Sequence, residues 1–234
     1  MINNVRQTVL DLVRKSNNGY LTPDEFNRMA HMAQLDIFDE MMSKYADTVV
    51  KRTMGLGGHD AADLEGRIME AIETFIVPES TLTYSAPNFI VPTDCYKIID
   101  KSLVYNSTVP VSKVEGRRAL AQLRASNLTA PSTLFPVYSK TQSGLRVEPT
   151  TITSLIKMDY IRYPKAPKWT YVTAPGSDAP LFNISAVDYQ DFELPKFFED
   201  DLIIKILQYA GVSLREAELV QATKSEEIQN KQEQ

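Results

Sequence analysis

Few side chains in this sequence are of the types that form catalytic or metal sites. The chain contains two histidines, His31 and His59, and one cysteine, Cys95. Leu35 occupies the position four residues after His31, so the second ligand of a helical zinc site is missing. Cys95 follows Asp94 and has no basic neighbour in the sequence that would activate its thiol. We therefore expect no catalytic residue, no metal site and no bound cofactor.

Two loops have the composition of ligand-binding loops without the required pattern. Met54–Gly58 is rich in glycine, but it lacks the residues of a P-loop and the spacing of a dinucleotide-binding loop. Ser16–Glu25 matches the later part of a calcium loop, but Arg14 stands where the first carboxylate ligand should be. Neither segment predicts a phosphate site or a calcium site.

Charge is unevenly distributed along the chain, although the net charge is only −5. Residues 1–100 contain 9 basic and 15 acidic side chains, and residues 101–170 contain 11 basic and 3 acidic ones. Residues 171–190 contain 2 acidic and no basic side chains, and residues 191–234 contain 5 basic and 10 acidic ones. The basic middle could bind nucleic-acid phosphates, or the acidic ends could neutralise it within or between subunits.

Aromatic and basic side chains gather in Met158–Tyr171, at the end of a predicted strand. Pro164 and Pro167 favour an extended, unpaired backbone between that strand and the aromatic residues that follow. The basic side chains could lie over the neighbouring rings. The segment is either a docking edge for a partner or a strap that closes a β domain. Its candidate partner contacts are Tyr160, Arg162, Tyr163, Lys168 and Trp169.

The first third of the chain is predicted to be helical. Residues 3–16 repeat apolar residues at helical spacing. Thr22 and Glu25 have the spacing of a capping box with Pro23 at the first helical position, which predicts the start of a long helix. A third helix is expected over residues 60–75.

From Pro78 to about Tyr189 the sequence is rich in Pro, Thr, Ser, Val and Tyr, which favours strands and turns. The expected strands are Thr81–Tyr84, Phe89–Val91, Ile98–Tyr105, Pro136–Tyr138, Leu145–Val147, Leu155–Tyr163, Trp169–Val172 and Leu181–Ile184. Ser112 and Glu115 have capping-box spacing, which predicts one helix over Val114–Leu123. Its arginines, Arg117, Arg118 and Arg124, could contact phosphates or form a solvated helix face.

Glu193–Glu216 is predicted to form a helix, a tight turn and a second helix. Pro195 suits a first helical turn, and Gly211 suits a left-handed C-terminal end. Ser213 and Glu216 have the spacing of another capping box. The second helix becomes polar after Val220, so we expect it to reach a neighbouring subunit. The candidate contacts there are Leu214, Arg215, Glu218 and Val220.

These elements predict an α+β fold with three regions. Residues 1–77 should be helical, residues 78–190 should form a mainly antiparallel β domain with one short helix, and residues 191–234 should form the helical pair and a polar tail. We expect 1–77 and 191–234 to pack together as one helical layer. The composition, with 43% hydrophobic and 24% charged residues, is that of a soluble globular protein, and we expect no membrane span and no signal peptide.

The sequence resembles head–tail connector or ring proteins of crAss-like and related short-tailed bacteriophages. The resemblance rests on the order of several blocks rather than on a catalytic signature. The blocks are Tyr20-Leu-Thr-Pro-Asp-Glu-Phe26, Pro92-Thr-Asp-Cys-Tyr96, Tyr160-Ile-Arg-Tyr-Pro-Lys-Ala-Pro-Lys-Trp169, Ile206-Leu-Gln-Tyr-Ala-Gly-Val-Ser-Leu-Arg-Glu216 and Glu226–Gln232.

This resemblance implies a non-enzymatic virion protein that is made in the host cytoplasm and repeated in a ring at the head–tail junction. Its implied partners are copies of itself, the portal protein and neighbouring connector and tail proteins. Double-stranded DNA would pass through the lumen without sequence-specific binding. Two other classes remain open: a nucleic-acid-binding module that uses residues 101–170, and an enzyme such as a hydrolase, for which the sequence offers no catalytic set.

Overall fold

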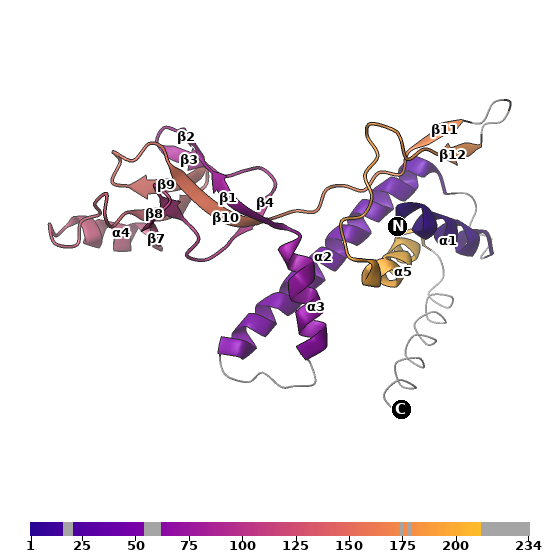
Figure 1. Ribbon diagram of the computed structural model, residues 1–234, viewed down its shortest axis with the longest axis horizontal. Coiled ribbons are helices and arrows are strands. Elements are labelled where there is room, and N and C mark those ends of the chain that lie inside the picture. The colour runs from indigo at the N-terminus through magenta and orange to yellow at the C-terminus, as the bar shows by residue number, and fades with distance from the viewer. Residues whose placement is uncertain (16–20, 54–61, 174–175, 177–178, 212–234) are drawn as a thin grey trace. The chain divides into compact units, whose positions relative to one another are not determined.

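The computed structural model describes residues 1–15, 21–53, 62–173, 176 and 179–211 of the 234-residue chain. Helices and largely antiparallel sheets are both present, which confirms the predicted α+β class. The elements are labelled in chain order in Figure 1. The chain forms two compact units, here named unit 1 (Met1–Ala71 with Pro164–Gln234) and unit 2 (Ile72–Tyr163).

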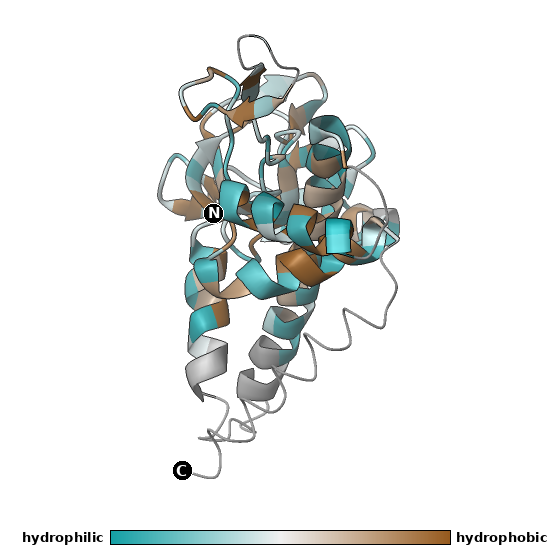
Figure 2. Cartoon of the chain, turned by 90° about the vertical axis from the view of Figure 1, so that its right-hand side faces the viewer, coloured by the Kyte–Doolittle hydropathy of each residue, from teal (hydrophilic) through white to brown (hydrophobic). Residues whose placement is uncertain are grey.

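The helices of unit 1 come from both ends of the chain. The described ones are α1 (Ile2–Lys15), α2 (Pro23–Thr53), most of α3 (Ala62–Glu73), the short 3-10 helix η2 (Lys196–Phe198) and α5 (Glu199–Tyr209). α5 packs against both α1 and α2, as expected for N-terminal and C-terminal helices that form one layer. Figure 2 shows hydrophobic and hydrophilic positions alternating along the helices, which is typical of amphipathic helices with one buried face.

The predicted capping box at the start of α2 is confirmed. The backbone N–H of Thr22 donates to Glu25 Oε2 at 2.9 Å, and the backbone N–H of Glu25 donates to Thr22 Oγ1 at 3.3 Å. These reciprocal bonds satisfy donors that a helix N-terminus otherwise leaves open. The hydrogen bonds from Thr22 also hold the pKa of the Glu25 carboxyl below its ordinary value.

α5 begins and ends close to the predicted positions. Pro195 precedes η2, and the acidic residues Glu199, Asp200 and Asp201 form the first turn of α5, where the helix dipole favours negative charge. Gly211 has φ +70°, the left-handed conformation expected at the C-terminal end. The predicted second helix lies outside the described residues, as do its candidate contacts Leu214, Arg215, Glu218 and Val220.

Unit 2 contains two five-stranded sheets. In the first, β10 (Ile156–Arg162) pairs with β1 (Ile76–Thr81), β4 (Cys95–Ile98) and β5 (Val104–Tyr105), and β5 pairs with β6 (Val109–Pro110). The order of the second is β2 (Thr83–Ser85), β3 (Asn88–Ile90), β9 (Gly144–Glu148), β8 (Val137–Thr141) and β7 (Ser112–Lys113). All these pairs are antiparallel except β7 with β8. The buried core includes Phe89, Leu103, Leu145, Ile156 and Met158.

Gly144 allows β9 to approach β3 closely. Its φ is +135°, and a Cβ at this position would lie 2.2 Å from the carbonyl oxygen of Phe89. Only glycine therefore fits at the start of β9 without a shift of backbone. This close approach places the start of β9 directly against β3.

Several local predictions in the β region are wrong. The expected strand Thr81–Tyr84 is interrupted at Leu82, between β1 and β2. The expected strand Ile98–Tyr105 is divided between β4 and β5, because Lys101 adopts φ 62° in an intervening turn. The helix predicted from Val114 begins only at Arg117, as α4 (Arg117–Arg124), with Gly116 at its N-cap. Ser112 cannot cap it, because its backbone N–H donates to the carbonyl oxygen of Pro136 at 3.0 Å as part of the sheet.

The segment after β10 belongs to unit 1 rather than to the predicted 78–190 β domain. Here Pro164–Leu194 is named the strap. Gln34, on α2, holds both of its ends: Gln34 Nε2 donates to the carbonyl oxygen of Lys165 at 2.8 Å, and the N–H of Glu193 donates to Gln34 Oε1 at 3.2 Å. Burial of this glutamine among helical residues could not be foreseen from its polarity.

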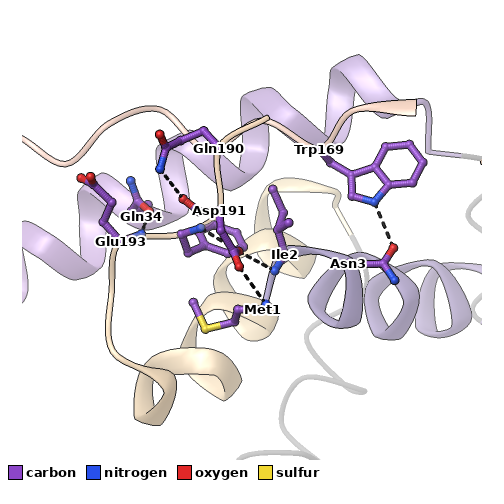
Figure 3. Close-up of polar contacts among 9 residues, drawn as sticks. Met1, Ile2, Asn3, Gln34, Trp169, Gln190, Asp191 and Glu193 are labelled. Atoms are coloured by element: carbon purple, nitrogen blue, oxygen red, sulfur yellow. Dashed lines mark hydrogen bonds and ion pairs between the residues drawn. The ribbon is translucent and has the colours of Figure 1, made fainter. Parts of the chain in front are cut away.

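Asp191 ties the strap to the first residues of α1, as Figure 3 shows. Its carboxylate accepts hydrogen bonds from the Met1 ammonium at 2.9 Å, from the Ile2 N–H at 2.7 Å and from the Phe192 N–H at 2.8 Å. Burial raises the pKa of the Asp191 carboxyl, but these bonds outweigh burial and hold the pKa below its ordinary value.

We expect Asp191→Asn to lower the free energy of unfolding by about 1 kcal/mol near neutral pH. The native pKa of Asp191 is depressed, so its carboxylate stabilises the fold at pH values above its ordinary pKa of 3.8, and this contribution is lost as pH falls through the native pKa. The difference between variant and wild type should therefore vanish in strong acid. Urea titrations at several pH values, followed by the fluorescence of Trp169, the chain's single tryptophan, measure this difference in the free energy of unfolding. An equal difference at every pH would contradict the assignment.

Candidate partner-binding surfaces

Trp169 is an internal anchor of unit 1 and not a partner contact. Its side chain is 2% exposed. Its backbone N–H donates to Asn27 Oδ1 at 2.8 Å. Its indole N–H donates to Asn3 Oδ1 at 3.1 Å, as Figure 3 shows. The guanidinium of Arg6 lies over the ring, 3.8 Å from its centroid. The docking-edge interpretation is therefore wrong at this residue: the strap is a fixed crossover, although it crosses helices rather than closing a β domain.

The other candidates from the same segment lie in different surroundings. Tyr160 is buried, and its hydroxyl donates to Asp94 Oδ1 at 3.1 Å. Arg162 lies over a ring, but the ring is that of Phe75, 5.6 Å from its Cζ, and not one of the neighbouring rings of the predicted segment. Tyr163 is exposed and packs edge-on against Tyr96.

Lys168 is exposed but does not lie over a ring as predicted; Arg6 takes that position above Trp169. The Lys168 ammonium instead lies 2.5 Å from Asp188 Oδ2. This hydrogen bond raises the pKa of Lys168 and lowers the pKa of Asp188. The pair bridges two parts of the strap, so Lys168 contributes to an internal contact of unit 1.

An exposed apolar surface lies beyond Trp169, on a hairpin formed by β11 (Tyr171–Thr173) and β12 (Pro180–Phe182). Tyr171 and Phe182 each stack on Trp169 with ring centroids 5.8 Å apart. Because side chains alternate along a strand, the next pair, Val172 and Leu181, faces the opposite way. Both are about half exposed, at 50% and 52%.

We name this surface the hairpin patch. Its members are apolar, exposed and close in the chain: Val172, Leu181, Ile184 and Val187. Hydrophobic positions on the hairpin are brown near the top of Figure 2. Strand alternation in the sequence could have indicated two faces, but only the stacking on Trp169 shows which face is left exposed.

A second exposed apolar surface follows α4 in unit 2. Leu128, Leu134 and Phe135 are 95%, 70% and 76% exposed. The loop that carries them is held by its own hydrogen bonds: Thr129 Oγ1 donates to the carbonyl oxygen of Leu123 at 3.0 Å, and the Phe135 N–H donates to the carbonyl oxygen of Ser132 at 3.1 Å. The loop therefore presents these side chains in a defined arrangement.

A groove of about 900 Å³ lies between α4 and the β8–β9 hairpin. We name it the α4 groove. Its charged lining residues are Lys113, Glu115, Arg124, Lys140 and Arg146, a surplus of three positive charges. Its remaining lining residues include small apolar side chains and the polar residues Ser139, Thr141 and Gln142.

Two arginines of the α4 groove are held by a buried carboxylate beneath them. The Glu148 side chain is 7% exposed and forms ion pairs with Arg124 and Arg146. Arg124 Nε donates to Glu148 Oε2 at 2.6 Å, and Arg146 Nε lies 3.5 Å from Glu148 Oε1. Three arginines are predicted on the helix that forms α4. Arg124 lines the groove, and Arg118 is exposed. The side chain of Arg117 lies outside the described part of the structure.

The chemistry available in the α4 groove is that of anion binding. The hydrogen bond from Lys113 holds the pKa of the Glu115 carboxyl below its ordinary value, which makes it a weak proton acceptor. Burial raises the pKa of the nearby Cys95 thiol, so this thiol is not an activated nucleophile. Among the described residues, no group of three His, Cys, Asp or Glu side chains could hold a metal ion. None of the described helices is both long and apolar enough to cross a bilayer.

Comparisons with known proteins give this chain no family. No protein-family model matches the sequence, and no curated protein is significantly similar to it. Any functional conclusion therefore depends on the surfaces described above and on the resemblance in the order of sequence blocks.

Proposed function

We propose that this protein is a non-enzymatic structural component of a bacteriophage particle. In this proposal several copies form a ring in the head-to-tail connector, join the portal to the tail and surround the path of the DNA. The observation that carries the proposal is the hairpin patch, because four apolar side chains are exposed on the β11–β12 hairpin and on the turns directly after it, and the hairpin stacks on Trp169 through its other face. Grouped exposed apolar side chains are typical of surfaces that another polypeptide covers. We assign a second copy of this chain as the partner that covers it.

The distribution of charge between the two units supports the same proposal. Unit 1 contains 15 basic and 23 acidic residues, whereas unit 2 contains 10 basic and 7 acidic residues. Units of opposite net charge favour contacts between unlike surfaces of neighbouring copies. A contact between two different surfaces is heterologous, and repeated heterologous contacts form a ring when their rotation closes.

The α4 groove favours a second candidate function, a nucleic-acid-binding module. Its surplus of positive charge could meet phosphates. However, Arg124 and Arg146 are already paired with Glu148, and Lys113 is paired with Glu115. This candidate requires DNA affinity that falls steeply as salt is raised, whereas a connector must let DNA slide and should bind it weakly.

The proposal is tested by the mass and symmetry of the purified full chain. We expect native mass spectrometry and electron microscopy over a concentration series to reveal closed rings of many copies. Tight, strongly salt-dependent binding to duplex DNA by a chain that forms no ring would instead support the nucleic-acid-binding module.

A further inference from the structure

We propose that the α4 groove of one copy binds the acidic first turn of α5, Glu199–Asp201, of a second copy. The inference rests on the ring proposed above and names two of the surfaces that meet in it. Its ligand class is a cluster of carboxylates on a protein surface.

The α4 groove is positive even when the carboxylate beneath it is included. Four basic side chains and Glu115 line it, and Glu148 is buried below, which leaves a surplus of two positive charges. Lys140 is exposed and forms no ion pair with any of the described carboxylates. A cluster of carboxylates would therefore meet a positive surface with at least one uncommitted ammonium group.

The arginines of the groove are held in position before any partner arrives. Glu148 holds Arg124 from α4 through a hydrogen bond and an ion pair, and it forms a longer ion pair with Arg146 from β9, so basic groups from two elements converge. A guanidinium has five N–H donors, so Arg124 and Arg146 together have ten. The single carboxylate of Glu148 cannot accept hydrogen bonds from all of them. Arginine donors that are oriented in this way bind a further carboxylate with little loss of side-chain freedom.

The first turn of α5 has the matching chemistry. Glu199, Asp200 and Asp201 are consecutive carboxylates, and Asp200 is exposed. Phe197, two residues earlier, is 41% exposed. An aromatic ring beside a carboxylate cluster suits a groove whose basic rim surrounds apolar side chains, and the groove provides these as Val114, Leu120 and Ala121.

Duplex or single-stranded nucleic acid fits this groove less well. Among the described residues that line it, there is no aromatic side chain on which a base could stack. A volume of about 900 Å³ suits a small cluster of side chains rather than a duplex. The groove lies in unit 2 and the acidic turn lies in unit 1, so the two surfaces differ, as a head-to-tail ring contact requires.

Carbodiimide cross-linking of an equal mixture of ¹⁴N-labelled and ¹⁵N-labelled full-length chains tests which surfaces meet. The reagent joins a lysine amine to a carboxylate in direct contact, with the lost water taken up by the reagent. We expect peptide pairs that join Lys140 or Lys113 to residues 199–201, with one heavy and one light peptide in the pair. Cross-links of the groove lysines only to other carboxylates, or only between peptides of one isotope, would overturn the inference.

Charge reversal gives a second test. Lys140→Glu and Asp200→Lys should each weaken self-association by about tenfold or more in sedimentation experiments, because each places like charges opposite one another. A mixture of the two variants should recover association. The new carboxylate in the groove of the Lys140→Glu variant then meets the new ammonium group in the α5 turn of the Asp200→Lys variant. Lys97→Glu and Asp11→Lys, which change exposed charges elsewhere in units 2 and 1, are matched controls and should have little effect.

The outcomes separate this inference from the proposed function. Rings that form normally in Lys140→Glu and Asp200→Lys would overturn the groove contact and leave the ring intact. A mixture that fails to recover association would also overturn it. Absence of both self-association and cross-links at every concentration would contradict the inference and the ring together. DNA binding lost in Lys140→Glu, with self-association unchanged, would assign the groove to nucleic acid instead.

Discussion

Replacing Trp169 with alanine is expected to lower the free energy of unfolding of unit 1 by about 3–5 kcal/mol. The side chain is almost completely buried and connects three parts of the unit: α1 through Asn3 and Arg6, and each of the two strands of the hairpin through stacking. The hydrogen bond between Asn27 and the backbone N–H of residue 169 does not depend on the side chain and remains in the variant. The substitution leaves a large cavity and also leaves polar partners unsatisfied. Urea unfolding followed by circular dichroism at helical wavelengths measures the loss, since Trp169 is the only tryptophan.

The matched control for this prediction is Tyr171→Ala. Tyr171 stacks on the same indole ring but is itself exposed, so its removal should cost about 1 kcal/mol. A Trp169→Ala variant that is no less stable than Tyr171→Ala would contradict the assignment of Trp169 as the anchor of the strap.

The double substitution Val172→Glu and Leu181→Glu is expected to abolish assembly while the chain stays folded. Both side chains are half exposed in the isolated chain, so charge is tolerated there. In the proposed assembly a neighbouring copy covers them, and burial of two unpaired carboxylates would cost several kcal/mol. Each 1.4 kcal/mol is a tenfold loss of association, so the ring should fall below detection in native mass spectrometry.

Met32→Glu provides the comparison for this variant. Met32 is a similarly exposed apolar residue of unit 1, on α2 and outside the hairpin patch. It should leave assembly unchanged. If the hairpin variant assembles as well as Met32→Glu does, the hairpin patch is not an interface between copies.

The elements that the sequence predicts well are those whose signals are local. The capping box of Thr22 and Glu25 and the left-handed Gly211 depend on hydrogen bonds or dihedral angles within a few residues, and both are found as predicted. The capping-box spacing of Ser112 and Glu115 fails for a non-local reason, because the backbone around Ser112 pairs with β8. A pairing between segments far apart in the sequence overrides a weak helix signal.

The candidate surfaces depend on contacts that no local pattern encodes. The aromatic strap indicates packing, but its docking onto α1 and α2 requires Asn3, Asn27 and Gln34, which are unremarkable polar residues of helices. The groove requires Glu148 to lie beneath two arginines from different elements. The sequence identifies Arg124 as a basic residue of the helix, but only the fold shows that it forms an ion pair with Glu148.

The central claim, that the chain is a ring component of a phage head-to-tail connector, is tested most directly by its location in the intact particle. Under this proposal, electron microscopy of the phage particles that contain the chain, with gold-labelled antibodies against it and symmetry averaging around the tail axis, gives this location. We expect label confined to the junction between head and tail, and a closed ring of copies around the axis. Label elsewhere on the particle, or recovery of the chain only from the soluble fraction of infected cells, would contradict it.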